Sequence, residues 1–194
     1  MSPAATRDAI LERAVDLAST EGLEGLTIGR LATELRMSKS GLFGHFGSKE
    51  ELQLATVRAA ADRFVAAVVE PTLRAEEGLP RLRALCRRYL EYLERPVFPG
   101  GCFWGAVTPE FDDRPGPVRD LIRDGMAAWL GLLERNAAAA GLEDPAQVAF
   151  ELNALAQAAN SSAQLFGDRQ AFKRAREAME RRLAGAGGCE AAHA

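Results

Sequence analysis

The sequence has little of what most enzymes and metal proteins depend on. It contains two histidines, His45 and His193, and three widely spaced cysteines, Cys86, Cys102 and Cys189. Scattered cysteines in odd number indicate buried free thiols rather than a disulfide framework or a paired-cysteine zinc site. Because one histidine lies in the first quarter of the chain and the other near the C-terminus, the larger part between them has none for a Ser/His/Asp or Cys/His group. No phosphate-binding glycine loop or metal motif is present. We therefore expect no enzymatic activity, no metal site and no cofactor.

Long hydrophobic runs are also missing. No segment approaches the ~18 apolar residues that cross a bilayer, and the N-terminus lacks the basic-then-apolar pattern of a signal peptide. We expect no membrane association and a cytoplasmic location. The chain has 194 residues with 47% hydrophobic content, enough for one or two modest domains with a true core. Its formal charge is −3, so total charge does not indicate nucleic-acid binding and only the placement of basic residues could.

The segment 37–49 carries the clearest local signal. Ser38 can cap a short helix that runs to about Phe46, because its hydroxyl can accept a hydrogen bond from an amide of the first turn. Leu42 and Phe46 are four residues apart and would share the buried face. The other face offers small or donor-bearing side chains without a carboxylate: Lys39, Ser40, Gly41 and His45. Such a face can enter a DNA groove, although a solvated polar face is the simpler alternative.

A second short helix is predicted directly upstream. Thr27 can cap it, and its apolar residues recur at helical spacing: Ile28, Leu31, Ala32 and Leu35. Arg36 and Met37 then separate the two helices. Two short helices joined by so tight a turn predict a helix-turn-helix unit, in which the second helix enters the major groove.

Residues 6–54 resemble the TetR family of bacterial transcriptional repressors. The resemblance is carried by Gly25-Leu26-Thr27-Ile28 and by Ser38-Lys39-Ser40-Gly41-Leu42-Phe43-Gly44-His45-Phe46-Gly47-Ser48-Lys49-Glu50-Glu51-Leu52, and it covers about a quarter of the chain. It implies that Lys39, Ser40 and Gly41 read bases. It also implies that Thr27, Phe43, His45 and Lys49 meet the DNA backbone, and with the cap Ser38 these complete the predicted DNA-binding set.

The chain departs from the family pattern at two positions. Phe43 replaces the usual tyrosine, which removes a phenolic contact to phosphate and leaves ring packing. Arg36 replaces a common glycine in the turn, where a positive φ would cost roughly 1–2 kcal/mol for a residue with a Cβ. The fold prediction does not depend on either position.

Helical periodicity continues to residue 184 and predicts an all-α fold. Helices are expected over residues 6–21, 48–70, 80–94, 102–107, 117–140, 145–166 and 168–184. We predict a helix-turn-helix DNA-binding domain over 1–47, a helical effector-binding and dimerisation domain over 48–184, and a disordered tail over 185–194.

The second domain holds the candidate effector site. Uncharged amides follow one side of the helix 145–166: Asn153, Gln157, Asn160 and Gln164. They could line a cavity, cross a dimer interface or face water. Apolar walls could come from Phe64, Phe103, Trp104, Met126 and Trp129, for which ordinary core packing is the alternative. A stripe at heptad spacing is assigned to a dimer seam or to core packing: Ala149, Leu152, Ala156, Ala159, Ala163 and Phe166.

The resemblance implies a ligand-responsive repressor that binds a palindromic DNA operator as a homodimer. In that family the helix corresponding to 48–70 transmits binding of a small-molecule effector to the DNA-reading helices. Two alternatives remain open: a helical adaptor that binds a small molecule or protein without specific DNA binding, and a thiol sensor acting through Cys102. Cys102 has no Lys, Arg or His beside it in the sequence to lower its pKa.

Overall fold

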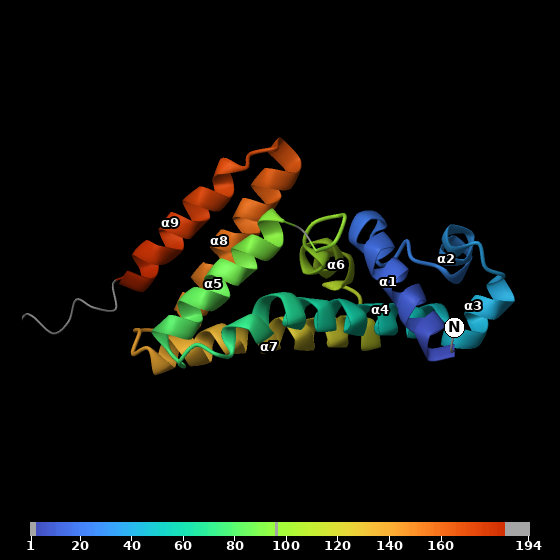
Figure 1. The fold of residues 1–194 in the computed structure, drawn as a ribbon, viewed down its shortest axis with the longest axis horizontal. Coiled ribbons are helices and arrows are strands. Elements are labelled where there is room, and N and C mark those ends of the chain that lie inside the picture. Colours follow the sequence, from blue (N-terminus) through green and yellow to red (C-terminus); the bar gives the residue numbers. More distant parts are fainter. Residues whose placement is uncertain (1–2, 96, 185–194) are drawn as a thin grey trace, which may run out of the picture. The chain divides into compact units, whose positions relative to one another are not determined.

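The computed structural model describes residues 3–95 and 97–184, and every element within these ranges is helical (Figure 1). The α-helices are α1 (Pro3–Glu21), α2 (Ile28–Leu35), α3 (Lys39–Phe46), α4 (Lys49–Phe64), α5 (Leu79–Glu94), α6 (Phe103–Phe111), α7 (Pro117–Ala139), α8 (Pro145–Phe166) and α9 (Gln170–Ala184). This confirms the all-α prediction. None of these helices is both long and apolar enough to cross a membrane.

The described residues form two compact units. The first contains the residues up to 63 together with 97–125, and the second contains 64–95 together with 126–184. The domain limits expected from the sequence, at residues 47 and 184, stay a prediction. The expected tail, 185–194, lies outside the described residues.

Side-chain caps fix the starts of three helices in the first unit. The Thr27 hydroxyl accepts the Arg30 N–H at 3.0 Å, and the Ser38 hydroxyl accepts the Gly41 N–H at 3.1 Å. The Ser48 hydroxyl accepts the N–H of Glu51 at 3.0 Å at the start of α4. Each cap satisfies a backbone donor that the helix itself leaves unpaired, which explains why the three predicted starts are correct.

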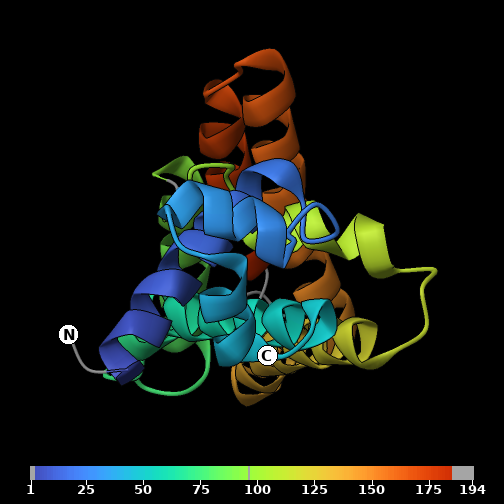
Figure 2. The same cartoon turned by 90° about the vertical axis from the view of Figure 1, so that its right-hand side faces the viewer.

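The helices α1, α2 and α3 enclose a small apolar core. α2 and α3 contact each other, and Figure 2 views the protein from the end that carries these two helices. The core side chains that are almost fully buried include Ile10, Ala14, Leu17, Leu31, Leu42 and Phe46. The residues that α1 contributes, Ile10, Ala14 and Leu17, recur at helical spacing, so one side of α1 faces this core.

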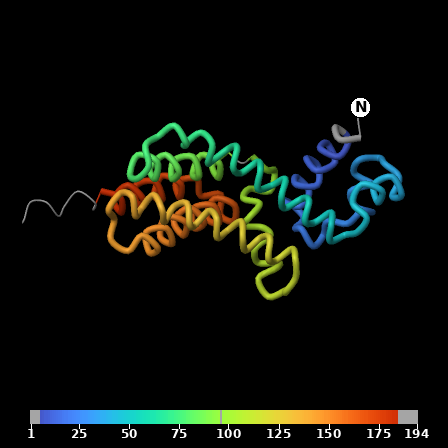
Figure 3. The backbone as a smooth tube through the Cα atoms, turned by 90° about the horizontal axis from the view of Figure 1, so that it is seen from below, coloured from blue at the N-terminus to red at the C-terminus, as the bar shows by residue number. Residues whose placement is uncertain are grey.

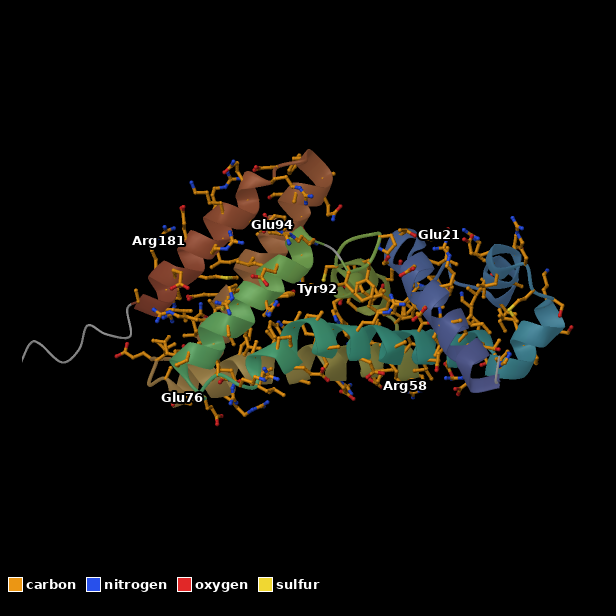
Figure 4. The ribbon with its side chains drawn as sticks, in the orientation of Figure 1. Glu21, Arg58, Glu76, Tyr92, Glu94 and Arg181 are labelled. Atoms are coloured by element: carbon orange, nitrogen blue, oxygen red, sulfur yellow. The ribbon has the colours of Figure 1, made fainter. Side chains whose placement is uncertain are left out.

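A chain of charged groups also joins α1 to α2. Arg30 on α2 donates to Glu21 at 2.5 Å and to Glu34 at 2.9 Å, and Arg13 on α1 also pairs with Glu34. Figure 4 labels Glu21 at the end of α1. The guanidinium groups of Arg13 and Arg30 lower the pKa of Glu34, and the two carboxylates raise the pKa of Arg30.

The long helix expected over residues 48–70 differs in its last turns. The α-helix ends at Phe64, and the chain continues as a π-helical turn, Val65–Val69, and a 3-10 turn, Glu70–Thr72. Pro71 has no N–H, and its ring would clash with the carbonyl four residues earlier in a regular α-helix. The backbone widens ahead of Pro71, so that the Glu70 N–H bonds the Val65 carbonyl.

The short helix expected at 102–107 extends to Phe111 as α6. Phe103, Val107 and Phe111 are all buried at four-residue spacing, which favours continuing the helix through Pro109. α6 packs on α1 within the first unit, and the Glu110 carboxylate accepts the N–H of Glu24 at 2.9 Å.

The second unit contains Phe64 at the end of α4, the π-helical and 3-10 turns, α5, α7 from Met126 onward, α8 and α9. Figure 3 shows α8 and α9 running side by side, joined by a short turn. Four residues of the predicted heptad stripe are buried, namely Ala149, Leu152, Ala156 and Ala159. Their role is core packing within the chain, whereas Phe166 at the end of the same stripe is exposed.

Candidate nucleic-acid interface and ligand site

The helix α3 has one buried side and one open side. Leu42 and Phe46 are 0% and 6% exposed and anchor it to the first unit. Lys39, Ser40, Gly41 and Phe43 are exposed and His45 is half-buried, so the predicted reading residues stand on the open side. The open side carries hydrogen-bond donors and no carboxylate. It can therefore approach a polyanion without like-charge repulsion from α3 itself.

Two side chains near the start of α3 are held in place. The Ser38 oxygen accepts the Gly41 N–H and lies 3.3 Å from the Ser40 hydroxyl oxygen, so Ser38 serves mainly as the cap. The stem of Lys39 lies along α2, because a Cβ added at Gly29 would stand 3.4 Å from the Lys39 Cε. Lys39 thus extends from a position defined by both helices of the helix-turn-helix unit.

The turn between α2 and α3 is left-handed at Arg36. Arg36 has φ 53° and ψ 36°, and its N–H donates to the carbonyls of Ala32 and Thr33. The Met37 N–H donates to the Ala32 carbonyl at 2.9 Å, which closes the end of α2. The positive φ expected at Arg36 is therefore present, and the residue bears the strain of a Cβ in that region.

Lys49, a predicted phosphate contact, is paired within the chain. Its Nζ lies 2.7 Å from Glu24 Oε1, and Arg114 Nη1 lies 3.4 Å from Glu24 Oε2. The hydrogen bond from Lys49 is the main reason that the pKa of Glu24 is lowered. Sequence reasoning missed Glu24 and Arg114, because nothing in local spacing brings either of them to Lys49.

Four aromatic rings form a cluster in the second unit, which we call the aromatic cluster: Phe64, Tyr89, Tyr92 and Trp129. The Phe64 ring is edge-on to Trp129 and Tyr92, with centroids 5.2 Å and 5.3 Å away. Tyr89 and Trp129 are 4.9 Å apart, and Figure 4 labels Tyr92 on α5. These separations are those of favourable aromatic pairs, so a ligand entering here would have to part the rings.

Two amides of the predicted row on α8 contact the aromatic cluster, whereas Gln164 of the same row is exposed. Trp129 Nε1 donates to Asn153 Oδ1 at 3.2 Å, and Gln157 Nε2 donates to the Tyr89 hydroxyl oxygen at 2.6 Å. Asn160, one turn further, is 8% exposed, and its Oδ1 has no hydrogen-bond partner among the described residues. The cluster therefore combines apolar ring surface with fixed amides, which is the usual composition of a ligand site.

The other predicted effector residues lie elsewhere. Phe103 and Trp104 belong to the first unit, where their rings are 5.7 Å apart and Phe103 also packs against Phe98. Met126 is half-buried in the second unit, three residues before Trp129 on α7. A role in effector binding stays a prediction for all three.

Sequence reasoning missed Tyr89 and Tyr92 as site residues. They are the only two tyrosines of the chain, and they stand three residues apart on one face of α5. That spacing on a buried face was the available signal, because a buried tyrosine usually places its hydroxyl against a polar partner.

The two cysteines within the described residues are buried. Burial raises the pKa of the Cys86 thiol to about 12, and Cys102 is 2% exposed. Reactive thiols are exposed and have lowered pKa values, so neither burial nor this pKa favours a thiol sensor. Within the described ranges, no three His, Cys, Asp or Glu side chains are grouped to hold a metal ion.

A groove of about 340 Å³ is lined by residues of both α8 and α9. We call the side of the two helices that carries this groove their outer side. The lining of the groove includes small and aliphatic side chains of α8, with arginines of α9 beside them: Leu155, Ala158, Ser162, Arg174 and Arg181. Figure 4 labels Arg181 on α9. Leu165 and Phe166, at the end of α8, are 76% and 77% exposed. This outer side therefore combines a shallow groove with exposed apolar side chains.

Both parts of the chain match known family models. The family described as "Tetracyclin repressor-like, C-terminal domain" matches residues 78–179, which is more than half of the chain. The family described as "Bacterial regulatory proteins, tetR family" matches residues 10–56, the part that contains α2 and α3.

Curated and solved relatives agree with these matches. The HTH-type transcriptional repressor AcnR of Corynebacterium efficiens is 40% identical over 68 residues, which are 35% of this chain and 36% of AcnR. The match thus spans about a third of that relative. A TetR transcriptional regulator from Chloroflexus aurantiacus is 22% identical with a TM-score of 0.82, covering 93% of this chain and 94% of its own.

A second solved structure is AibR in complex with isovaleryl coenzyme A and operator DNA. It is 23% identical with a TM-score of 0.71, and covers 89% of this chain and 95% of its own. At such identities the two solved structures support the fold, and the family models support the membership. The chain belongs to the TetR family of bacterial regulatory proteins.

Proposed function

We propose that this protein is a ligand-responsive transcriptional repressor that binds a palindromic DNA operator as a homodimer. The observation that carries the proposal is α3, a capped helix anchored by Leu42 and Phe46 whose open side bears donors and no carboxylate. Family membership and the likeness to AcnR, a named repressor, support it. The role is regulatory rather than catalytic, and we place it in the cytoplasm.

The DNA contacts follow from the position of each side chain on the helix-turn-helix unit. Lys39, Ser40 and Gly41 read base edges from the first turn of α3. Phosphate and sugar contacts come from Thr27, Ser38, Phe43, His45 and Lys49. Because each phosphate contact releases counterions, binding weakens steeply as salt is raised.

The homodimer uses the outer side of α8 and α9. Small side chains such as Ala158 and Ser162 let a second pair of helices approach closely, and Leu165 and Phe166 supply exposed apolar surface. Two copies of α3 then engage successive major grooves, about 34 Å apart, as in other dimeric helix-turn-helix proteins.

The effector binds at the aromatic cluster. α4 begins at Lys49, a proposed phosphate contact, and ends at Phe64, a ring of the cluster. A ligand that parts the rings moves the end of the helix whose start contacts DNA. Such coupling requires that the ligand bind the DNA-free state more tightly than the DNA-bound state. The similar structure of AibR was solved in complex with isovaleryl coenzyme A and operator DNA.

The proposal is tested with a DNA duplex that the wild-type protein selects from a random-sequence library. Fluorescence anisotropy then compares wild type with the double variant Lys39→Ala, Lys49→Ala at several salt concentrations. We expect the double variant to bind at least about tenfold more weakly and to show a smaller salt slope. The control is Lys173→Ala, an exposed lysine on α9 outside the helix-turn-helix unit, which should bind as the wild type does.

Two results would contradict the proposal. The first is a selection that enriches no sequence, because the protein would then have no specific DNA binding. The second is a double variant that binds the duplex as tightly as the wild type. If a small molecule still raised the melting temperature of a protein without sequence preference, the adaptor alternative would be favoured.

A further inference from the structure

Asn160 on α8 is a buried amide whose side-chain oxygen has no partner among the described residues. The residue is 8% exposed, and its Oδ1 accepts no hydrogen bond from this part of the chain. Buried polar atoms are nearly always hydrogen-bonded, because burial without a bond costs the hydration that the atom loses. Asparagine also favours a helix less than alanine or leucine does. Neither the helix nor the core therefore explains an amide at this position.

The place of Asn160 on α8 brings it to the aromatic cluster. It follows Asn153 by seven residues and Gln157 by three, so the three amides project from the same side of α8. α5 and α8 contact each other and run in the same direction (Figure 1). Gln157 meets Tyr89 on α5. Asn160 therefore lies about one helical turn further along, level with Tyr92.

The other two amides are already engaged by rings of the cluster. Asn153 Oδ1 accepts the indole N–H of Trp129. Gln157 Nε2 donates to the Tyr89 hydroxyl oxygen. Asn160 Oδ1 is thus the acceptor that this row offers to a molecule entering the cluster. Because an amide oxygen accepts from N–H and O–H groups, such a molecule must present one of these donors.

The rings of the cluster indicate the body of the ligand. They are packed edge to face or stacked, with centroids 4.9–6.2 Å apart. A molecule that parts the rings must replace these contacts, and a flat aromatic surface replaces them best. The rings and amides carry no full charge, so they cannot compensate the cost of burying a charged ligand.

We propose that Asn160 is the specificity-determining residue of the effector site, and that the effector is an uncharged aromatic compound with an N–H or O–H donor. The donor pairs with Asn160 Oδ1, while the aromatic body packs among the rings of the cluster. This inference rests on the proposed function, in which the effector binds at the aromatic cluster.

The test uses three related probes. Indole donates through its N–H, benzofuran has an oxygen in place of that N–H, and indole-3-carboxylate adds a negative charge to indole. Isothermal titration calorimetry measures the Kd of each probe for the wild type and for Asn160→Ala, which removes the acceptor. Asn160→Leu gives the same comparison if circular dichroism shows that the alanine variant is not folded. Gln164→Ala is the matched control, because Gln164 is an exposed amide one turn further along α8.

We expect the wild type to bind indole about three- to tenfold more tightly than benzofuran, which is the effect of one net hydrogen bond. Indole-3-carboxylate should bind at least about tenfold more weakly than indole, because its charge has no partner in the cluster. Asn160→Ala should bind indole and benzofuran equally. Gln164→Ala should keep the wild-type preference for indole.

Four results would overturn the inference. In three of them the wild type binds benzofuran as tightly as indole, binds the carboxylate best, or binds none of the probes at millimolar concentration. In the fourth, Asn160→Ala keeps the preference for indole.

The proposed function is judged separately, because selection of a DNA duplex uses no effector. A wild type that selects a duplex but fails the probe test would contradict the inference alone. A wild type that prefers indole through Asn160 but selects no duplex would support the ligand site and contradict the proposed repressor.

Discussion

Arg36 in the turn between α2 and α3 offers a prediction that depends on backbone geometry alone. Its φ of 53° places a residue with a Cβ in the left-handed region. That conformation costs about 1–2 kcal/mol, which Arg36→Gly removes. Glycine also gains freedom in the unfolded chain, which offsets about 0.4–1 kcal/mol of the gain. The net expectation is a stabilisation of about 0.5–1 kcal/mol.

Thermal unfolding followed by circular dichroism measures this effect. In a protein of this size, a stabilisation of 0.5–1 kcal/mol raises the melting temperature by roughly 1–4 °C. Arg36→Ala is the matched control, because it removes the guanidinium but keeps the Cβ in the same conformation. The control should not be stabilised.

The reasoning would be refuted by equal stabilisation of the glycine and alanine variants, since the arginine head group would then be responsible. It would also be refuted by a glycine variant that melts below the wild type. Either result would mean that the backbone at Arg36 carries no strain that glycine can relieve.

Other consequences of the structure can be measured separately. Glu24→Gln removes the carboxylate that holds Lys49 at 2.7 Å, so binding of the selected duplex at low salt should tighten by about two- to fivefold; an unchanged Kd would contradict this. Because the pKa of Glu34 is lowered in the folded state, the charged carboxylate stabilises the fold at pH values above about 4.5, the usual pKa of this group. That stabilisation is lost as the pH falls through the folded-state pKa. Melting temperatures between pH 3 and 6 should accordingly fall less on acidification in Glu34→Gln than in the wild type, and parallel curves would contradict it. Gln157→Leu removes the donor to the Tyr89 hydroxyl and should destabilise the protein by about 1 kcal/mol in urea unfolding, whereas an unchanged midpoint would show that this bond contributes nothing. Cys86, with a pKa raised to about 12, should resist an aromatic disulfide reagent at pH 8 until guanidinium unfolds the protein, and rapid labelling of the native state would refute its burial.

The helix-turn-helix unit could be predicted because its signals are local. Thr27, Ser38 and Ser48 each cap a helix through an amide three residues on, and the apolar residues of α2 and α3 recur at helical spacing. Local chemistry determines these features. The strained turn at Arg36 was expected only from the resemblance, because Arg36 replaces a glycine that is common at this position of the family.

The remaining features depend on contacts between distant segments. Lys49 pairs with Glu24, and the Tyr89 ring packs against Trp129. The residues of each pair are far apart in the sequence, and no periodic pattern predicts that they come together. The π-helical turn before Pro71 was also missed, because periodicity identifies an apolar helix but not a local widening of its backbone. The expected partnership of Trp104 with Phe64 was inferred from residue type alone, and the two belong to different units.

Hydroxyl-radical footprinting of the selected duplex tests the central proposal most directly. If two copies of α3 occupy successive major grooves, the protected sugars form two blocks whose centres lie about 10–10.5 base pairs apart, related by a two-fold axis. The Lys39→Ala, Lys49→Ala variant should lose both blocks together. A single block, or protection spread evenly along the duplex, would contradict paired reading helices on a palindromic operator.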